Sequence, residues 1–167
     1  MGSRAAVIVD CYTAALRILK YRFNSEVELR RKLRSKRYES GEIDATMERL
    51  RTERWLDDDR FAGAFVRTRS NRRVGKLRIR RELQAAGVSN DSANQAIAEN
   101  VDPERERASL AALCAKRMRM LVRKHGREYV TTDEGRANLV GYLVAQGYDF
   151  ALVREVVRDV AIANVSS

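Results

Sequence analysis

The sequence is short of the residues that break helices and of the residues that hold metals. It has one proline and nine glycines among 167 residues, too few for a turn-rich β fold. The two cysteines, Cys11 and Cys114, lie too far apart to indicate a disulfide framework or a metal knuckle, and the one histidine, His125, stands among basic residues. We therefore expect buried, reduced thiols, no metal ion and no cofactor.

Long apolar runs and catalytic motifs are also missing. Residues 5–9 form a short apolar run that Asp10 interrupts, and no run approaches the roughly 18 apolar residues of a membrane span. The sequence has no Walker loop, no HExxH motif and no serine nucleophile elbow. These absences predict a cytoplasmic protein that binds no membrane and is not an enzyme.

Positive charge is what the chain has in excess. Its 33 lysines and arginines outnumber 23 aspartates and glutamates, for a formal net charge of +10 at pH 7. This balance favours an anionic partner, with nucleic acid as the first candidate, although a merely soluble basic surface would give the same totals. Hydrophobic residues make up 44% of the chain, which is enough for a real core.

Apolar residues recur at helical spacing along nearly the whole chain, and one pattern of six positions occurs three times. The second copy follows the first by 50 residues and the third follows the second by 60. The first copy is Leu29, Leu33, Arg37, Tyr38, Ile43 and Met47; the second is Ile79, Leu83, Gly87, Val88, Ala93 and Ile97; the third is Leu139, Leu143, Gly147, Tyr148, Val153 and Val157. Each copy predicts a helix, a tight turn and a second helix, with Gly87 and Gly147 ending the first helix in the left-handed conformation.

Another helical segment precedes each pair, near residues 10–22, 58–71 and 103–125. We therefore predict an all-α protein of three tandem three-helix repeats in one continuous domain, at 10–53, 57–100 and 102–164. One such unit buries little apolar surface, so neighbouring units must stack into an elongated, curved body. Few apolar stripes are left over, which favours a monomer.

Three consecutive aspartates, Asp57 to Asp59, stand where the helix over 58–71 is expected to begin. Carboxylates there accept backbone amide hydrogens, and such a cap contributes about 1 kcal/mol. Neither metal ligands at EF-hand spacing nor a partner base follows, so we interpret the triplet as a cap, with Trp55 and Leu56 placed to pack as a staple. Further predicted caps are Ser25 with Glu28, Thr131 with Glu134, and Asp102 with Pro103.

The stretch around these aspartates joins a cap, an aromatic face and a basic helix at fixed spacing. Its residues are Trp55, Leu56, Asp57, Asp58, Asp59, Arg60, Phe61, Ala62, Phe65, Val66, Arg67, Thr68, Arg69, Gly75, Arg78, Ile79, Glu82 and Leu83. This combination resembles the signature of the RecX family, and residues 28–33 resemble that family's first repeat. The resemblance covers about residues 12–100, and the third unit by pattern only. Arg54 stands where the family usually has glycine, and Lys76 where it often has proline.

The resemblance implies a regulator, mainly an inhibitor, of the bacterial recombinase RecA, acting in homologous recombination, DNA repair and the SOS response. Family members bind along the helical groove of the RecA–DNA filament and limit its extension, ATP hydrolysis and strand exchange. The resemblance therefore implies RecA and single- or double-stranded DNA as partners, and no catalytic residue.

Basic clusters supply the candidate binding residues. The first comprises Arg30, Arg31, Lys32, Arg34, Lys36 and Arg37, of which Arg30, Arg31 and Arg34 are the candidate binding residues. The second comprises Arg67, Arg69, Arg72, Arg73, Lys76, Arg78, Arg80 and Arg81, with no acid in between, and a third spans residues 116–127. The second cluster is the best candidate, because like charges repel unless an anion is near and arginine suits forked contacts to phosphate or carboxylate. Solvated helix faces would show similar runs of charge, and few aromatic residues interleave for base stacking.

Two other functions remain open on the sequence alone. A basic three-helix unit also resembles helix-turn-helix architecture, so the chain could bind DNA directly without RecA. It could also be an adaptor for an acidic protein.

Overall fold

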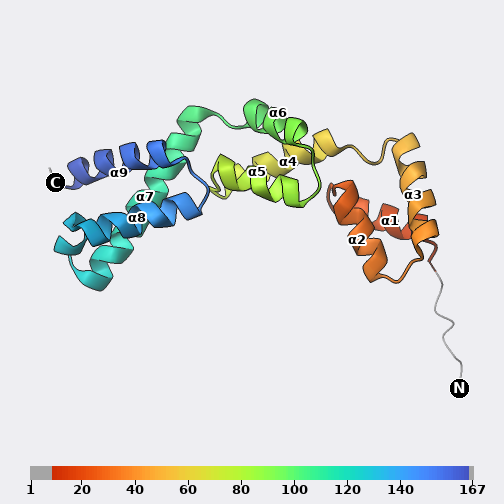
Figure 1. Ribbon diagram of the computed structural model, residues 1–167, viewed down its shortest axis with the longest axis horizontal. Helices are drawn as coiled ribbons and strands as arrows, with labels where there is room; N and C mark the ends of the chain where they lie inside the picture. Colours follow the sequence, from red (N-terminus) through yellow and green to blue (C-terminus); the bar gives the residue numbers. More distant parts are fainter. Residues whose placement is uncertain (1–8, 166–167) are drawn as a thin grey trace, which may run out of the picture.

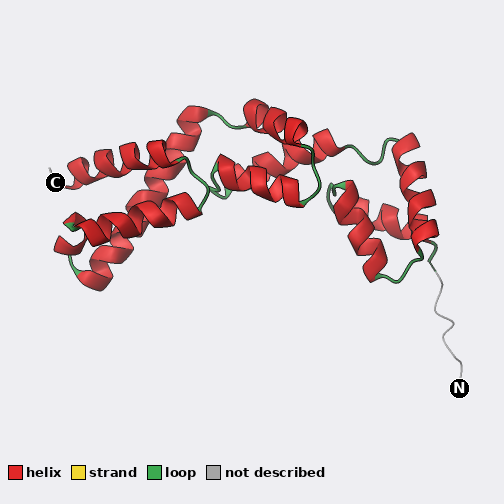
Figure 2. Ribbon diagram, viewed as in Figure 1, coloured by secondary structure: helices red, strands yellow, loops and turns green. Residues whose placement is uncertain are grey.

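The computed structural model describes residues 9–165, with side chains described to residue 160, so most of the apolar run at 5–9 lies outside it. Within this range the chain forms nine α-helices and no strand, which confirms the all-α prediction (Figure 2). The helices are α1 (Cys11–Tyr21), α2 (Glu26–Ser35), α3 (Ser40–Thr52), α4 (Asp58–Asn71), α5 (Lys76–Ala85), α6 (Asn90–Asn100), α7 (Pro103–His125), α8 (Asp133–Ala145) and α9 (Phe150–Val165). A 3₁₀ turn, η1 (Glu128–Thr131), joins α7 to α8.

The helices are arranged as three groups of three in an open arch (Figure 1). Helices α1–α3 form one end, α4–α6 the middle and α7–α9 the other end. We call these groups the first, second and third triplet. The central helices α2, α5 and α8 lie along the concave side of the arch, and α3, α6 and α9 lie along the outer side. The body is therefore elongated and curved, whereas the boundaries at 10–53, 57–100 and 102–164 stay a prediction.

Each triplet has its own apolar core, built from the positions that the repeat pattern singled out. Leu33, Leu83 and Leu143, which correspond to one another in the pattern, are all fully buried. Separate clusters of buried side chains form around the first two of these residues, and two clusters lie within the third triplet. Because the triplets do not share one core, the contacts between them must come from other residues.

Two joints connect the triplets, and both are built in the same way. In each joint the N-terminal end of a central helix packs against the turn before the last helix of the next triplet. At the first joint the Ser25 hydroxyl donates to the Ala86 carbonyl oxygen at 2.6 Å. At the second joint the Gly75 amide donates to the Gln146 carbonyl at 2.9 Å, and the Leu77 amide to the next carbonyl, also at 2.9 Å. The two bonds at the second joint satisfy amides at the start of α5 that have no partner within that helix.

The close docking explains two glycines. Gly87 and Gly147 have φ angles of 85° and 92°, which confirms the predicted left-handed turns. A Cβ atom at Gly87 would lie 2.2 Å from Cγ2 of Val27, which belongs to the docked end of α2. Arg37 holds the corresponding turn of the first triplet at φ 67°, and within residues 9–165 no helix end docks there, so a side chain is tolerated.

The predicted caps are confirmed at α2, α4 and α7. The Asp57 carboxylate accepts the Arg60 amide at 2.9 Å, and Ser25 and Asp102 cap their helices in the same way. Glu28, however, does not complete a capping box, because its carboxylate pairs with Arg22 at 3.1 Å.

The predicted cap at Thr131 is wrong by one residue. The N-cap of α8 is Thr132, whose hydroxyl oxygen accepts the Gly135 amide at 3.1 Å. Thr131 belongs to the 3₁₀ turn η1, and its hydroxyl donates back to the Glu128 carbonyl at 2.7 Å. The turn places Thr131 in a helical conformation, so the first residue with extended backbone is Thr132.

The aspartate triplet does more than cap one helix. Asp57 caps α4, whereas the Asp58 carboxylate accepts the Glu26 amide of α2 at 3.3 Å, across the first joint. Burial raises the pKa of Asp58. Of the two residues expected to form a staple, Leu56 packs against the first core. The prediction for Trp55 is wrong, since this side chain is 54% exposed.

Candidate binding surface

The second basic cluster is less free of counter-charge than its sequence suggests. Arg69 and Arg78 both pair with Glu82, at 2.6 and 3.0 Å, and Lys76 pairs with Glu106 at 3.3 Å. The expectation that the whole cluster lacks acids was wrong, because folding brings Glu82 back onto α4 and Glu106 across from α7. Arg67 is also occupied, since it donates to the side-chain oxygen of Asn100 at 2.8 Å.

Four arginines of this cluster have neither an acidic partner nor a side-chain hydrogen bond within residues 9–160: Arg72, Arg73, Arg80 and Arg81. Arg72 and Arg73 lie exposed in the turn between α4 and α5. Arg81 is exposed to solvent on the same side of α5 as Leu77, since residues four apart share one side of a helix, and Arg80 next to it is half-buried. We call these four residues the free arginines of the second triplet.

Helix α2 presents a matching face in the first triplet. Arg30, Arg31 and Arg34 correspond to Arg80, Arg81 and Gln84 in the repeat pattern. Arg30 is held by Glu26 at 3.2 Å and by Asp44, so its charge is already compensated. Arg31 and Arg34 are exposed and have no acidic partner in the part of the chain that the structure describes. The solvent-exposed sides of α2 and α5 therefore both carry positive charge that no acidic side chain of the described chain compensates.

Helices α6 and α8 do not continue this charge pattern. Helix α6, on the outer side of the arch, carries Asp91 and Glu99 and no basic residue. On α8 the positions that correspond to the arginines are Val140, Gly141 and Val144. The surface of free arginines thus covers α2 and α5 and ends before α8.

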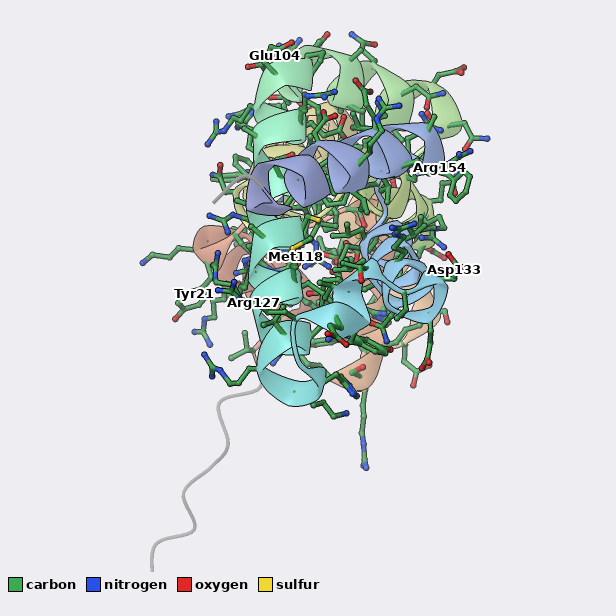
Figure 3. The ribbon with its side chains drawn as sticks, turned by 90° about the vertical axis from the view of Figure 1, so that its left-hand side faces the viewer. Tyr21, Glu104, Met118, Arg127, Asp133 and Arg154 are labelled. Atoms are coloured by element: carbon green, nitrogen blue, oxygen red, sulfur yellow. The ribbon has the colours of Figure 1, made fainter. Side chains whose placement is uncertain are left out.

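The long helix α7 carries a further row of cations that sequence reasoning left out of the candidate site. Lys116, Arg119, Arg123 and Arg127 are all exposed and recur at intervals of three or four residues along α7 and the turn after it. Figure 3 shows α7 along its length, with Arg127 near its end. These residues belong to the basic cluster at 116–127 that the sequence already shows, and their helical spacing places them in one row.

The signature residues around the aspartates hold the scaffold. Phe61, Ala62, Ile79 and Leu83 are buried in the second core, and Phe65 packs against it with its ring centroid 5.7 Å from that of Phe61. Other signature residues serve the joints. Arg60 lies over the Phe23 ring at 5.4 Å, and a Cβ atom at Gly75 would meet the backbone of Gly147 at 2.3 Å.

The described residues offer no group of acids, histidines or cysteines that could hold a metal ion. None of the helices in this part is long and apolar enough to cross a membrane. Burial raises the pKa of Cys114 to about 11 and that of Tyr148 to about 12, so both stay protonated at neutral pH. The Tyr148 hydroxyl donates to the Arg73 carbonyl at 3.0 Å, so the turn that carries Arg72 and Arg73 is hydrogen-bonded to the third triplet at the second joint.

Comparison with known proteins identifies relatives over nearly the whole chain. Family models of RecX match twice: the first three-helix domain over residues 11–50 and the second over residues 57–97. Regulatory protein RecX of Escherichia coli (strain K12) is 33% identical over 170 residues, covering 95% of this chain and 96% of that protein. Regulatory protein RecX of Clostridium botulinum (strain Eklund 17B / Type B) is 26% identical over 152 residues, covering 91% and 69%.

Two solved structures share the fold. The crystal structure of RecX from Lactobacillus salivarius superposes with a TM-score of 0.71 at 21% identity, covering 91% of this chain and 95% of that one. A second crystal structure, of a regulatory protein RecX, gives 0.72 at 23% identity, covering 89% and 70%.

Proposed function

Because the chain belongs to the RecX family, whose curated relatives are named regulatory proteins, we propose that it regulates a RecA recombinase, mainly as an inhibitor. In this proposal it acts in the cytoplasm as a monomer and binds along the groove of the RecA–DNA filament. It limits filament extension, ATP hydrolysis and strand exchange and catalyses no reaction of its own.

The observation that carries this proposal is the surface of free arginines on the central helices. Arg31, Arg34 and the four free arginines of the second triplet compensate no acid within the described chain. They can therefore pair with phosphates or carboxylates of a partner without first breaking an internal ion pair. Their helices α2 and α5 lie on the concave side of the arch, the side that suits a convex or helical partner.

Direct DNA binding of the helix-turn-helix type has less support. In a three-helix unit of the homeodomain kind the third helix reads the major groove. The third helix of the second triplet is α6, whose Asp91 and Glu99 would face the phosphates without any basic residue on that helix. The free arginines lie instead on the second helix of the first two triplets and in the turn before α5.

The test is ATP hydrolysis by the cognate RecA on single-stranded DNA, measured with and without the protein. We expect inhibition when far fewer than one copy of the protein is present per RecA subunit, because an elongated array can contact more than one subunit. Tight DNA binding with no effect on RecA's ATP hydrolysis or strand exchange would contradict the proposal and favour direct DNA binding.

Charge reversal tests which residues are responsible. Arg72→Glu with Arg73→Glu should weaken inhibition and leave the helical content unchanged, because both side chains are exposed in an inter-helix turn. The matched control is Arg154→Glu with Arg158→Glu, which changes the same charge on exposed positions of α9, on the outer side of the arch. We expect the control to inhibit like the unmodified protein. Equal loss in both variants would show that net charge alone matters.

Salt dependence then separates DNA from protein as the contact. If the two arginines touch single-stranded DNA, their loss should flatten the slope of log affinity against log salt by about 0.7 per lost phosphate contact. An unchanged slope with lost inhibition would assign them to carboxylates of RecA.

A further inference from the structure

A groove on the first triplet adjoins the surface of free arginines and shares Arg31 with it. Two adjoining cavities, of about 520 and 270 Å³, share Ile18 and Tyr21 of α1 and Lys36, the residue that ends α2. Most of the residues that line it belong to α1 and α2. Tyr21 is 88% exposed and projects from the edge of the molecule in Figure 3. Ile18 is the aliphatic floor of the groove, and an exposed aromatic side chain beside it is available to a partner.

The groove is lined with cations and no carboxylate. Its basic residues are Arg17, Arg22, Arg31, Lys32 and Lys36. Arg22 pairs with Glu28 outside the groove, whereas Arg17, Arg31 and Lys36 have no acidic partner among the described residues. Burial, followed by the charge of Arg22, lowers the pKa of Lys32, so the cations here repel one another and an incoming anion would relieve that repulsion.

The repeat pattern shows that these features are not required by the fold. At the positions of Ile18 and Tyr21 the second triplet has the polar residues Thr68 and Asn71. At the position of Lys32 it has an acid, Glu82, which neutralises two arginines. A three-helix unit of this family can therefore be built without an aliphatic residue at this place, and with Glu82 and Ala86 where the first triplet has Lys32 and Lys36.

We propose that the groove between α1 and α2 binds an acidic peptide segment of a partner protein in which carboxylates alternate with aliphatic or aromatic side chains. The carboxylates pair with Arg31 and Lys36 at the rim, and the apolar side chains cover Ile18 and stack against Tyr21. A nucleic acid strand fits less well, because its phosphates would use the cations and leave the aliphatic floor in water, and Tyr21 is the single exposed aromatic of the groove.

The probe is a fluorescein-labelled short peptide in which glutamate alternates with leucine, titrated with the full-length protein and followed by fluorescence anisotropy. We expect saturable binding that weakens about tenfold in the variant Arg31→Glu with Lys36→Glu, since two contacts are lost and two repulsions added. Arg154→Glu with Arg158→Glu, at the far end of the arch, makes the same change in net charge and should bind the peptide normally.

A second variant tests the apolar part. Tyr21→Ser should weaken binding of the glutamate–leucine peptide but not of a peptide in which serine replaces leucine, and an exposed tyrosine can be removed without loss of the fold. Equal binding of both peptides by the unmodified protein would reduce the groove to a charged patch and overturn the proposal.

The third measurement titrates labelled oligothymidylate with the protein in place of the peptide. If it binds in the groove more tightly than the peptide and loses affinity with Arg31→Glu and Lys36→Glu, the site belongs to nucleic acid and the proposal is wrong. Absence of binding by either probe also overturns it. None of these outcomes depends on inhibition of RecA, so this proposal and the proposed function can fail separately.

Discussion

The backbone of Gly147 packs directly against Arg78 of the neighbouring triplet. A Cβ atom at Gly147 would lie 2.2 Å from the Cβ atom of Arg78 and 2.5 Å from its amide nitrogen. The same glycine has a φ angle of 92°, and its carbonyl accepts the Leu77 amide at 2.9 Å. Gly147 therefore ends α8, turns the chain into α9 and contacts the N-terminal end of α5 at the second joint.

Substitution of this glycine should open the second joint. Gly147→Ala combines a left-handed backbone that alanine disfavours with a clash against main-chain atoms, and we expect it to lower the free energy of unfolding by at least about 2 kcal/mol. Chemical denaturation measures this loss, and small-angle scattering should show an increased radius of gyration. The control is Gly141→Ala on α8, where nothing described lies within 4 Å of the added carbon and helix propensity favours alanine by up to about 1 kcal/mol.

The repeat register predicts different costs for two leucines of α5. Leu83 is fully buried and Leu77 is 36% exposed. Leu83→Ala should lower the free energy of unfolding by about 2–5 kcal/mol, because it leaves a cavity in the second core, and Leu77→Ala by less than about 1 kcal/mol. Urea denaturation followed by circular dichroism compares the two. Equal losses would show that the side of α5 facing the core is wrongly assigned.

The cap of α8 can be located by a pair of threonine substitutions. Thr132→Ala removes the acceptor of the Gly135 amide and should cost about 1 kcal/mol of stability. Thr131→Ala removes a hydroxyl bond within an exposed 3₁₀ turn and should cost less than about 0.5 kcal/mol. A larger loss at Thr131 would restore the cap that the sequence suggested.

An ion-pair network at the start of α2 should make stability depend on acid. Burial opposes ionisation of Glu26, but hydrogen bonds from Arg51 and Arg30 outweigh it and hold the pKa of Glu26 below its usual value. Because the folded-state pKa is the lower one, ionised Glu26 contributes stability above the ordinary carboxylate pKa, and this contribution is lost as the pH falls through the folded-state value.

Glu26→Gln should therefore lower the free energy of unfolding by about 1 kcal/mol at pH 7 and make it less sensitive to acid below about pH 5. Denaturant titrations at a series of pH values provide the measurement. Glu99→Gln on α6, which changes an exposed carboxylate bonded only to Gln95 among the described residues, should leave the acid dependence as it is.

Much of the fold could be predicted from local patterns. The helices α1, α4 and α7 begin and end within one residue of the ranges read from apolar spacing, since burial of one face and capping by Asp57 or Asp102 act within a few residues. The same holds for the turns at Gly87 and Gly147, because the left-handed conformation favours glycine whatever surrounds it. The cap of α8 was missed by one residue, because no pattern in the sequence indicates the 3₁₀ turn before it.

The binding surface could be predicted only in part, because charge along the sequence does not show which charges meet in space. Arg69 and Arg78 lie in an unbroken basic run, yet Glu82 compensates both once α5 folds back on α4. Asp58, which the sequence presents as a cap of its own helix, instead holds the end of α2 across the first joint. Such pairings depend on how the triplets dock. Docking depends on a few hydrogen bonds between residues 32 to 75 positions apart, and these leave no periodic signal in the sequence.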